Sequence, residues 1–219
     1  MSKNPALVFL LLLLSFNSFS QDVAKLNVGL KAGLNLAGIN NTRYYESHVE
    51  INLLKTPFGG VYLHYKPTPK FALQPELIYA VQGMNSKTES RNTDLKLSYL
   101  NIPIMAKVYF GKRFNVQFGP QAGFLVNARE KGIQRDYTLA VSKVNINRRE
   151  YYKNADLAFC LGFGFDLPAR LEIATRLNLG ITNIEKNHET VLFAEGNGNG
   201  PVANRVIQFS LGYKLGKTN

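Results

Sequence analysis

Few side chains in this 219-residue sequence could perform acid–base or nucleophilic chemistry, and two polar stretches hold the best candidates. His48 stands beside Glu46 and Ser47, and His188 stands beside Glu189. A hydrolase or acyltransferase needs a nucleophile, a base and an orienting acid close together. The two stretches would have to meet at one end of the fold, and neither has the spacing of a catalytic motif. We therefore interpret them as solvated loop residues, expect no enzyme and name no catalytic residue.

The remaining candidates, a cysteine, a histidine and a glycine-rich stretch, do not form a metal-binding or cofactor-binding motif. Cys160 is the single cysteine, which excludes an intramolecular disulfide framework and a multi-cysteine metal site. It is small and is expected to pack against its neighbours. His64 is expected to be a hydrogen-bonded interior residue. The glycine-rich stretch 196–200 lacks the Lys-Ser/Thr that follows a phosphate-binding loop, so we expect neither cofactor nor metal.

Eight segments alternate between an apolar residue and a small or polar one, which is the period of a two-faced β-strand. Phe159, Cys160 and Leu161 show the pattern within the longest hairpin, where a turn at Pro168 joins two such segments. The eight segments are residues 26–37, 58–65, 71–82, 97–110, 114–128, 155–167, 171–181 and 206–215. The sequence therefore predicts an all-β protein.

The connections between these segments alternate in length. Short ones at 66–70, 111–113 and 166–170 are built from Gly, Pro and charged residues, and long ones occupy 38–57, 83–94, 129–154 and 185–204. Short periplasmic turns and long extracellular loops are typical of outer-membrane barrels. Alternation and loop length together predict an eight-stranded antiparallel up-and-down transmembrane β-barrel with both termini in the periplasm.

The apolar phase is expected to face lipid. A soluble lipocalin-like barrel would instead turn that phase inward around a ligand, but here the polar phase is rich in Gly, Asn and Gln, as a filled interior requires. Aromatic residues of the apolar phase also gather beside the short turns, where an interfacial girdle is expected. This predicted periplasmic-side girdle consists of Tyr65, Phe71, Phe110, Phe114, Phe165 and Tyr213.

An eight-stranded barrel has an interior that side chains fill. The bulky residues of the polar phase are Tyr62, Tyr99, Met105, Gln117, Gln121 and Arg176. Charged residues occur on the same phase, and buried charges require partners. We therefore predict a paired polar network in the lumen, and no open pore, formed by Lys31, Glu76, Lys107, Asp156, Glu172, Arg176 and Lys214.

Residues 1–20 have the pattern of a secretory signal peptide. Lys3 precedes the apolar stretch 6–14, which is too short to span a bilayer, and a small-x-small cleavage site precedes Gln21. The predicted organisation is a signal peptide at 1–20 and one barrel domain at 21–219. The formal net charge of +11 suits anionic lipid, lipopolysaccharide or nucleic acid as partners.

The loop at 129–153 is the most basic part of the chain. It contains Arg129, Lys131, Arg135, Lys143, Arg148, Arg149 and Lys153 against Glu130, Asp136 and Glu150. Such a loop could hold lipopolysaccharide phosphates, and the alternation in residues 137–146 suggests strands that continue above the membrane. A solvated, partly ordered loop is the simpler interpretation. Nucleic acid is not expected, because the aromatic residues lie on the apolar phase and are not interleaved with the basic ones.

Several stretches resemble the PorT-like outer-membrane β-barrel proteins of the Bacteroidota, a group often called the porin family. The resemblance is carried by residues 28–35, 71–79, 97–104, 118–125 and 209–215. It implies the barrel fold and the outer membrane strongly, and a role in supporting a protein secretion system weakly. It brings no catalytic residues.

The leading hypothesis is a non-enzymatic structural or interaction barrel whose surroundings are outer-membrane lipid and lipopolysaccharide. An envelope or secretion-system protein is the expected protein partner. Two alternatives stay open: an enzyme that modifies lipid A, and a narrow channel or small-ligand barrel.

Overall fold

The computed structural model describes residues 26–40, 50–135, 140–186 and 202–215. Its strands are β1 (Leu26–Asn40), β2 (Glu50–Asn52), β3 (Leu54–Thr68), β4 (Phe71–Lys87), β5 (Arg91–Phe110), β6 (Phe114–Arg135), β7 (Val141–Asn147), β8 (Ala155–Asp166), β9 (Leu171–Gly180) and β10 (Ala203–Lys214). A single turn of 3-10 helix, η4 (Arg149–Tyr151), follows β7. Among the described residues, no helix is long and apolar enough to cross a membrane.

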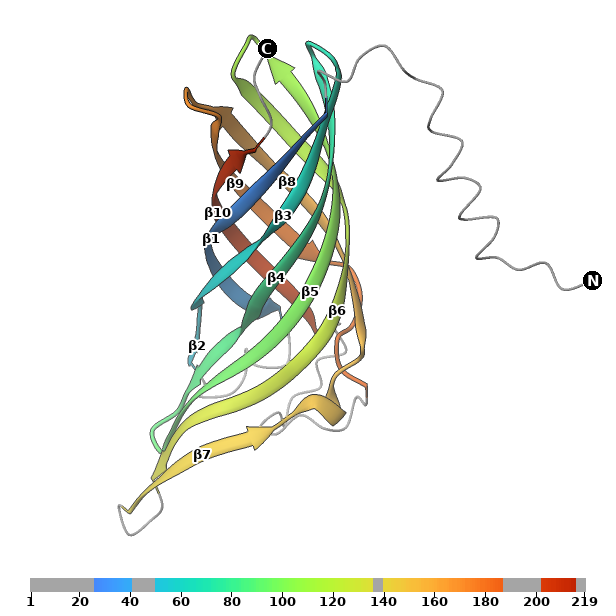
Figure 1. Cartoon of the computed structure of the whole chain (residues 1–219). Helices are drawn as coiled ribbons and strands as arrows, with labels where there is room; N and C mark the ends of the chain where they lie inside the picture. The colour runs from blue at the N-terminus through green and yellow to red at the C-terminus, as the bar shows by residue number, and fades with distance from the viewer. Residues whose placement is uncertain (1–25, 41–49, 136–139, 187–201, 216–219) are drawn as a thin grey trace, which may run out of the picture.

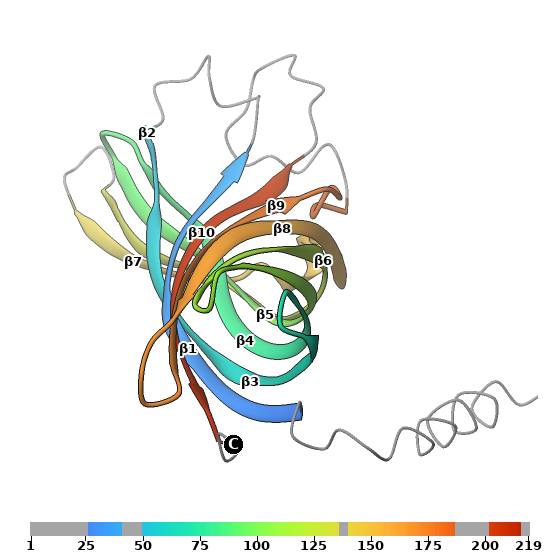
Figure 2. The same cartoon turned by 90° about the horizontal axis from the view of Figure 1, so that it is seen from above.

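Eight of the strands close into one ring. The order around it is β1, β3, β4, β5, β6, β8, β9 and β10, and β10 pairs with β1. Every pair is antiparallel, and each strand lies beside the next ring strand along the chain (Figures 1 and 2). This arrangement confirms the predicted up-and-down barrel. A closed ring leaves no free backbone edge, and lipid could not hydrogen-bond such an edge.

The short connections all lie at one end of the barrel, which we call the short-turn end. The start of β1 and the end of β10 are at the same end, at the top of Figure 1. In the β8–β9 turn the amide of Leu171 donates to the carbonyl of Pro168. Ala169 and Arg170 have φ values of 57° and 65°. Two consecutive left-handed residues are typical of a type I′ turn, which matches the twist of the strands it joins.

The opposite end carries a projecting sheet where the sequence predicts loops at 83–94 and 129–154. β4, β5 and β6 continue well beyond the rest of the ring, and β7 pairs with β6 (Figure 1). We call residues 83–98, 127–135 and 141–147 the flap, and this end the flap end. The prediction of loops was wrong here: β4 and β5 continue in one phase, with Met84 and Leu95 still buried, and β6 continues with its two faces exchanged.

A β-bulge causes that exchange. Ser98 pairs with Asn127 and Tyr99 pairs with Leu125, so Val126 has no partner in β5. Val126 and Asn127 are both exposed, and beyond them the buried positions of β6 are Ala128 and Glu130. One extra residue in a period of two reverses which side chains face inward. In β6, Ala128 and Glu130 therefore face the barrel interior, and Arg129, Lys131 and Ile133 face outward.

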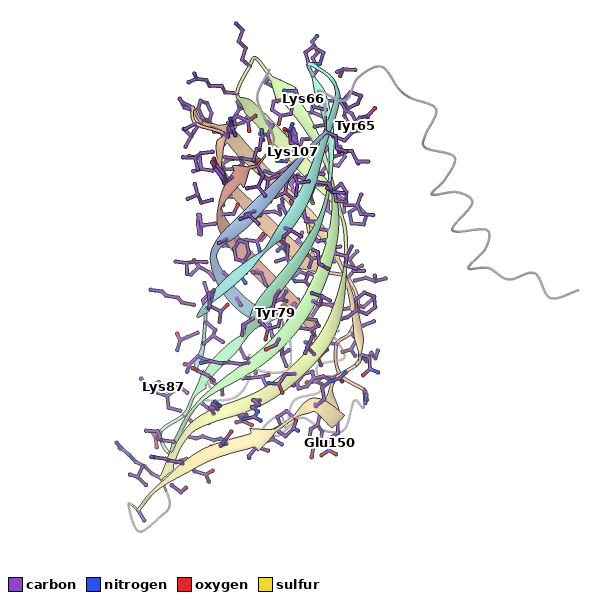
Figure 3. All side chains as sticks on the ribbon, viewed as in Figure 1. Tyr65, Lys66, Tyr79, Lys87, Lys107 and Glu150 are labelled. Carbon is purple, nitrogen blue, oxygen red and sulfur yellow. The ribbon has the colours of Figure 1, made fainter. Side chains whose placement is uncertain are left out.

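Between the flap and the short-turn end the outer wall of the barrel is apolar. The large side chains of the apolar phase are exposed along all eight ring strands, including Leu30, Val61, Leu77, Phe118 and Leu161. We call this surface the apolar band. In Figure 3 it extends from Tyr65 near the short-turn end to Tyr79 near the flap. Such a band is the lipid-facing surface of a transmembrane barrel.

Candidate functional site

The lumen is the chemically distinctive part of the molecule, and Glu76 on β4 lies at its centre. Lys31 Nζ on β1 donates to Glu76 Oε1 at 2.7 Å. Arg176 on β9 donates to both carboxylate oxygens, at 3.0 and 2.9 Å. Gln74 Nε2 donates to Oε1 at 2.7 Å, and Arg176 also donates to Gln117 Oε1 on β6 at 2.7 Å. We call these five residues the central network; its side chains come from four strands and cross the lumen.

Two further ion pairs lie beside the central network. Lys107 Nζ on β5 contacts Glu172 Oε1 on β9 at 2.5 Å, and both side chains are at most 1% exposed. Lys214 Nζ on β10 contacts Asp166 Oδ2 at 3.1 Å nearer the solvent. Isolated ions would be very costly in such an interior, whereas bidentate and multiply hydrogen-bonded pairs compensate much of the desolvation. The arrangement binds the strands together and fills the lumen.

The backbone at Gly162 shows why small residues accompany the charges. Gly162 on β8 pairs with Arg176 on β9. A Cβ atom at Gly162 would lie 2.2 Å from the carbonyl oxygen of Thr175 and 2.8 Å from Cα of Arg176. Only glycine allows the two strands this approach. Gly162 thereby helps to set the position from which Arg176 reaches Glu76.

Six of the seven predicted lumen residues occupy three separate places. Lys31, Glu76 and Arg176 meet in the central network, and Lys107 pairs with Glu172. Lys214 pairs with Asp166, which the sequence analysis assigned to a turn although it follows the same alternation. Gln74 and Gln117 were likewise not predicted as members of the network, because amide side chains give no charge signal.

The expectation that Asp156 joins an ion pair was wrong. Asp156 accepts hydrogen bonds from Thr182 Oγ1 and Asn204 Nδ2, both at 2.8 Å. It lies near the flap end of β8, opposite Gly123 on β6, ten strand positions from Asp166. Neutral donors satisfy its carboxylate, and it stays apart from Arg176.

The remaining reactive groups are structural where they are described. His64 Nδ1 lies 3.0 Å from Gln74 Oε1, and its ring meets the edge of Tyr109. Cys160 is buried with its sulfur 3.7 Å from Gln121 Oε1. His48 and His188 lie outside the described residues. Among the described residues, no three His, Cys, Asp or Glu side chains are grouped to hold a metal ion.

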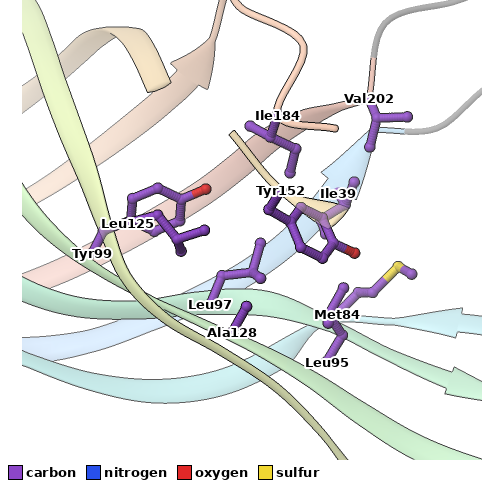
Figure 4. Packing of buried hydrophobic residues seen from close by; sticks show 10 residues of the cluster. All are labelled: Ile39, Met84, Leu95, Leu97, Tyr99, Leu125, Ala128, Tyr152, Ile184 and Val202. Atoms are coloured by element: carbon purple, nitrogen blue, oxygen red, sulfur yellow. The ribbon is translucent and has the colours of Figure 1, made fainter. Parts of the chain in front are cut away.

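A hydrophobic cluster fills the flap end of the lumen (Figure 4). Leu97 and Tyr99 on β5 and Leu125 on β6 continue the inward phase of their strands, and Ala128 faces inward because it follows the bulge. Ile39, Met84, Leu95, Tyr152, Ile184 and Val202 complete the cluster. The lumen is therefore filled twice, by ions in the half towards the short-turn end and by hydrocarbon at the flap end.

Charge on the flap is sorted between its two faces. Glu130 points inward, where Arg91 Nη2 contacts it at 2.5 Å and Arg148 Nη2 at 2.8 Å. Burial raises the pKa of Glu130, but hydrogen bonds from Arg148 and Thr93 and the two arginine charges outweigh burial and hold the pKa below its ordinary value of 4.5. The single acid of β6 beyond the bulge is thus neutralised on the inner side.

A cavity of about 730 Å³ opens at the short-turn end. His64, Lys66, Asp166, Arg170 and Lys214 contribute its polar lining. Lys66 Nζ lies 3.4 Å from the centre of the Tyr109 ring. His64 is hydrogen-bonded to Gln74, and Gln74 to Glu76, so the cavity ends against the central network.

The six predicted girdle aromatics lie on the outer wall beside the short turns. All are exposed, and Phe110 and Phe114 contact each other across the β5–β6 turn with ring centres 6.2 Å apart. Tyr65 is labelled in Figure 3. The complete set is Tyr65, Phe71, Phe110, Phe114, Phe165 and Tyr213. Aromatic rings at this level are suited to a membrane–water interface.

Comparison with known proteins also indicates an outer-membrane barrel. Residues 17–186 match the family described as Outer membrane protein beta-barrel domain. The chain belongs to this family. The outer membrane protein beta-barrel family places the protein in the bacterial outer membrane, so the apolar band is its lipid-facing surface. No protein of curated function matches the sequence.

Solved structures of small outer-membrane barrels are similar in fold. Neisserial surface protein A has a TM-score of 0.51 at 11% identity, over 86% of this chain and 97% of that chain. Ail, the attachment invasion locus protein of Yersinia pestis, has a TM-score of 0.46 at 9% identity, over 87% and 99%. OprG from Pseudomonas aeruginosa has a TM-score of 0.41 at 10% identity, over 87% and 96%. At these identities the likeness concerns the fold alone.

Proposed function

We propose that this protein is a closed, non-enzymatic barrel of the outer membrane that acts as a structural and interaction module. The observation that carries the proposal is the double filling of the lumen. The central network joins four strands through Glu76, and the hydrophobic cluster around Leu97 occupies the flap end. A lumen filled in this way favours a rigid scaffold over solute passage, and leaves the two ends of the barrel for contacts with partners.

We further propose that both termini are periplasmic and that the flap is extracellular. Short periplasmic turns and longer extracellular extensions are the rule in such barrels, and β1 and β10 meet the short turns. Cysteine labelling tests the orientation in a Cys160→Ala background. Ser142→Cys on β7 should react with a membrane-impermeant maleimide on intact cells, and Lys112→Cys in the β5–β6 turn should react only after lysis. The reverse pattern would overturn the orientation.

The expected partner is an envelope or secretion-system protein, in line with the PorT-like resemblance and a Bacteroidota source. Affinity purification of the tagged full chain from native membranes, after mild cross-linking, tests this role. One envelope protein should co-purify with the chain in near-stoichiometric amount. The same protein should be absent when an unrelated tagged barrel is purified in the same way. Recovery of the barrel with lipid alone would count against a protein partner. An unchanged lipid A mass spectrum in a deletion strain is expected, and a changed one would support the enzyme alternative.

A small-ligand role is the second candidate, supported by the cavity at the short-turn end. Lys66, Arg170 and Lys214 outnumber Asp166 in its lining, so an anionic solute would suit it. Calorimetric titration with inorganic phosphate, for the parent chain and for Arg170→Ala, tests this candidate. Saturable binding that Arg170→Ala weakens would support it, and the absence of binding would remove phosphate as the ligand.

A further inference from the structure

We propose that the outward face of the flap binds the phosphates of lipid A, the membrane anchor of lipopolysaccharide. Arg129 and Lys131 on β6, with Lys96 on β5, form the site. The inference rests on the proposed function, because it requires the flap to lie on the extracellular side. It deepens that function by naming the lipid partner and the residues that would hold it.

The bulge at Val126 creates the site. If β6 continued in the phase that turns Phe124 outward, Glu130 would face outward and Arg129 and Lys131 inward. With the extra residue, Arg129 and Lys131 are exposed and Glu130 is buried between two arginines. Bulges commonly serve to re-aim side chains. This bulge separates the charges of β6 beyond Val126, so that every charged residue on the outer face there is basic.

The neighbouring strands of the flap also present mostly basic residues on their outer face. Lys96 lies opposite Arg129, and Asp94 lies opposite Lys131. Lys96 Nζ is 3.4 Å from Asp94 Oδ2, with both side chains substantially exposed. Along the outward positions of β5, β6 and β7 that the structure describes, Asp94 is the single acid. The basic residues there are Lys96, Arg129, Lys131, Arg135 and Lys143.

The three nearest cations have the spacing of a phosphate site. Arg129 and Lys131 are two residues apart on one face of a strand, a separation of about 7 Å, and Lys96 lies about 5 Å from Arg129 across the ladder. Among the described residues, neither Arg129 nor Lys131 has a carboxylate within ion-pair distance. A guanidinium offers a bidentate fork to phosphate, and the two ammonium groups add charge beside it.

The position of the cations relative to lipid identifies the ligand. The apolar band ends at Tyr79, Phe124 and Val126, all strongly exposed. Arg129 follows Val126 by three residues, about 10 Å along the strand and less along the membrane normal because barrel strands are tilted. In Figure 3 Lys87, at the end of β4, likewise lies beyond Tyr79. The basic face thus begins at the headgroup level of the outer leaflet, where lipid A carries its phosphates.

Native mass spectrometry of the detergent-solubilised mature chain tests the proposal with bisphosphoryl lipid A as the probe. The decisive variant is Arg129→Glu/Lys131→Glu. Its matched control is Lys112→Glu/Arg113→Glu, which changes the net charge equally in the exposed turn at the opposite end. Heat-modifiable migration on gels verifies that each protein is folded. Monophosphoryl lipid A and phosphatidylglycerol distinguish lipid A phosphates from anionic lipid in general.

The flap variant should bind bisphosphoryl lipid A about tenfold more weakly than the parent, and the turn variant within about twofold of it. Monophosphoryl lipid A and phosphatidylglycerol should both bind the parent more weakly than the bisphosphoryl form. Equal losses in the two double variants, or equal binding of phosphatidylglycerol and lipid A, would overturn the proposal. Failure of the orientation itself would show separately, as an unlabelled Ser142→Cys on intact cells.

Discussion

Replacing Glu76 by Gln removes the carboxylate that Lys31 and Arg176 share, with almost no change of shape. Lys31 would keep a buried ammonium group and Arg176 a guanidinium that cannot lose its proton. Removing one partner of a buried ion pair costs about 3–5 kcal/mol, because the remaining charge is uncompensated. Two cations depend on Glu76, so we expect the free energy of unfolding to fall by about 3–5 kcal/mol or more.

The partner substitution should behave differently. Lys31→Met leaves Glu76 with the bidentate contact from Arg176 and the hydrogen bond from Gln74, so its cost should be about 1–3 kcal/mol. In the Glu76→Gln background, Lys31→Met removes an unpaired cation. The double variant should therefore be more stable than the sum of the single effects by about 0.5–3 kcal/mol.

Urea unfolding of the chain in lipid vesicles measures these differences. The protein contains no tryptophan, so circular dichroism at the β-sheet minimum is the suitable signal. Glu150→Gln, the same chemical change at an exposed position of η4, is the control and should lie within about 0.5 kcal/mol of the parent. A Glu76→Gln variant as stable as this control would refute the reasoning that the central network is a paired, buried assembly.

Three further predictions follow from the packing. Leu97→Ala in the hydrophobic cluster should cost about 2–5 kcal/mol in the same assay, and a loss below about 1 kcal/mol would show that the cluster is loosely packed. Gly162→Ala should cost about 1–3 kcal/mol, because its Cβ would lie 2.2 Å from the carbonyl oxygen of Thr175; unchanged stability would contradict the close approach. The pKa of Glu130 is lowered in the folded chain, so its pairing with Arg148 stabilises the flap above pH 4.5. That contribution is lost as the pH falls through the lower folded pKa. The protection factors of flap amides, which compare observed with intrinsic exchange at each pH, should therefore fall in acid, and Glu130→Gln should abolish that fall.

The ring could be predicted from the sequence because lipid and a filled lumen impose strict alternation. Residues 155–165 show the cause, since each Phe or Leu faces lipid and each Gly or Cys faces the interior. The β6 part of the flap could not be predicted, because the bulge at Val126 exchanges the two faces of that strand and its alternation no longer continues in one phase. Only the pairing of Ser98 with Asn127 reveals where the exchange occurs.

The lumen could be predicted in kind but only partly in detail. The alternation of residue types places Lys31, Glu76 and Arg176 on the lumen face of their strands. It does not show which residues of different strands lie at the same level along the barrel axis, because the strands are tilted. Asp156 and Arg176 share the hairpin and the phase, yet strand tilt and register put the carboxylate near the flap end. Amide partners such as Gln117 carry no net charge, so nothing in the sequence distinguished them from other polar lumen residues.

Single-channel recording in planar bilayers tests the closed lumen most directly. The refolded chain, with its folding verified by heat-modifiable migration, should give no discrete conductance steps at any applied voltage. That result is expected because the central network and the hydrophobic cluster both cross the interior. Stable, ohmic steps from the parent protein would contradict the account and would favour the narrow-channel alternative.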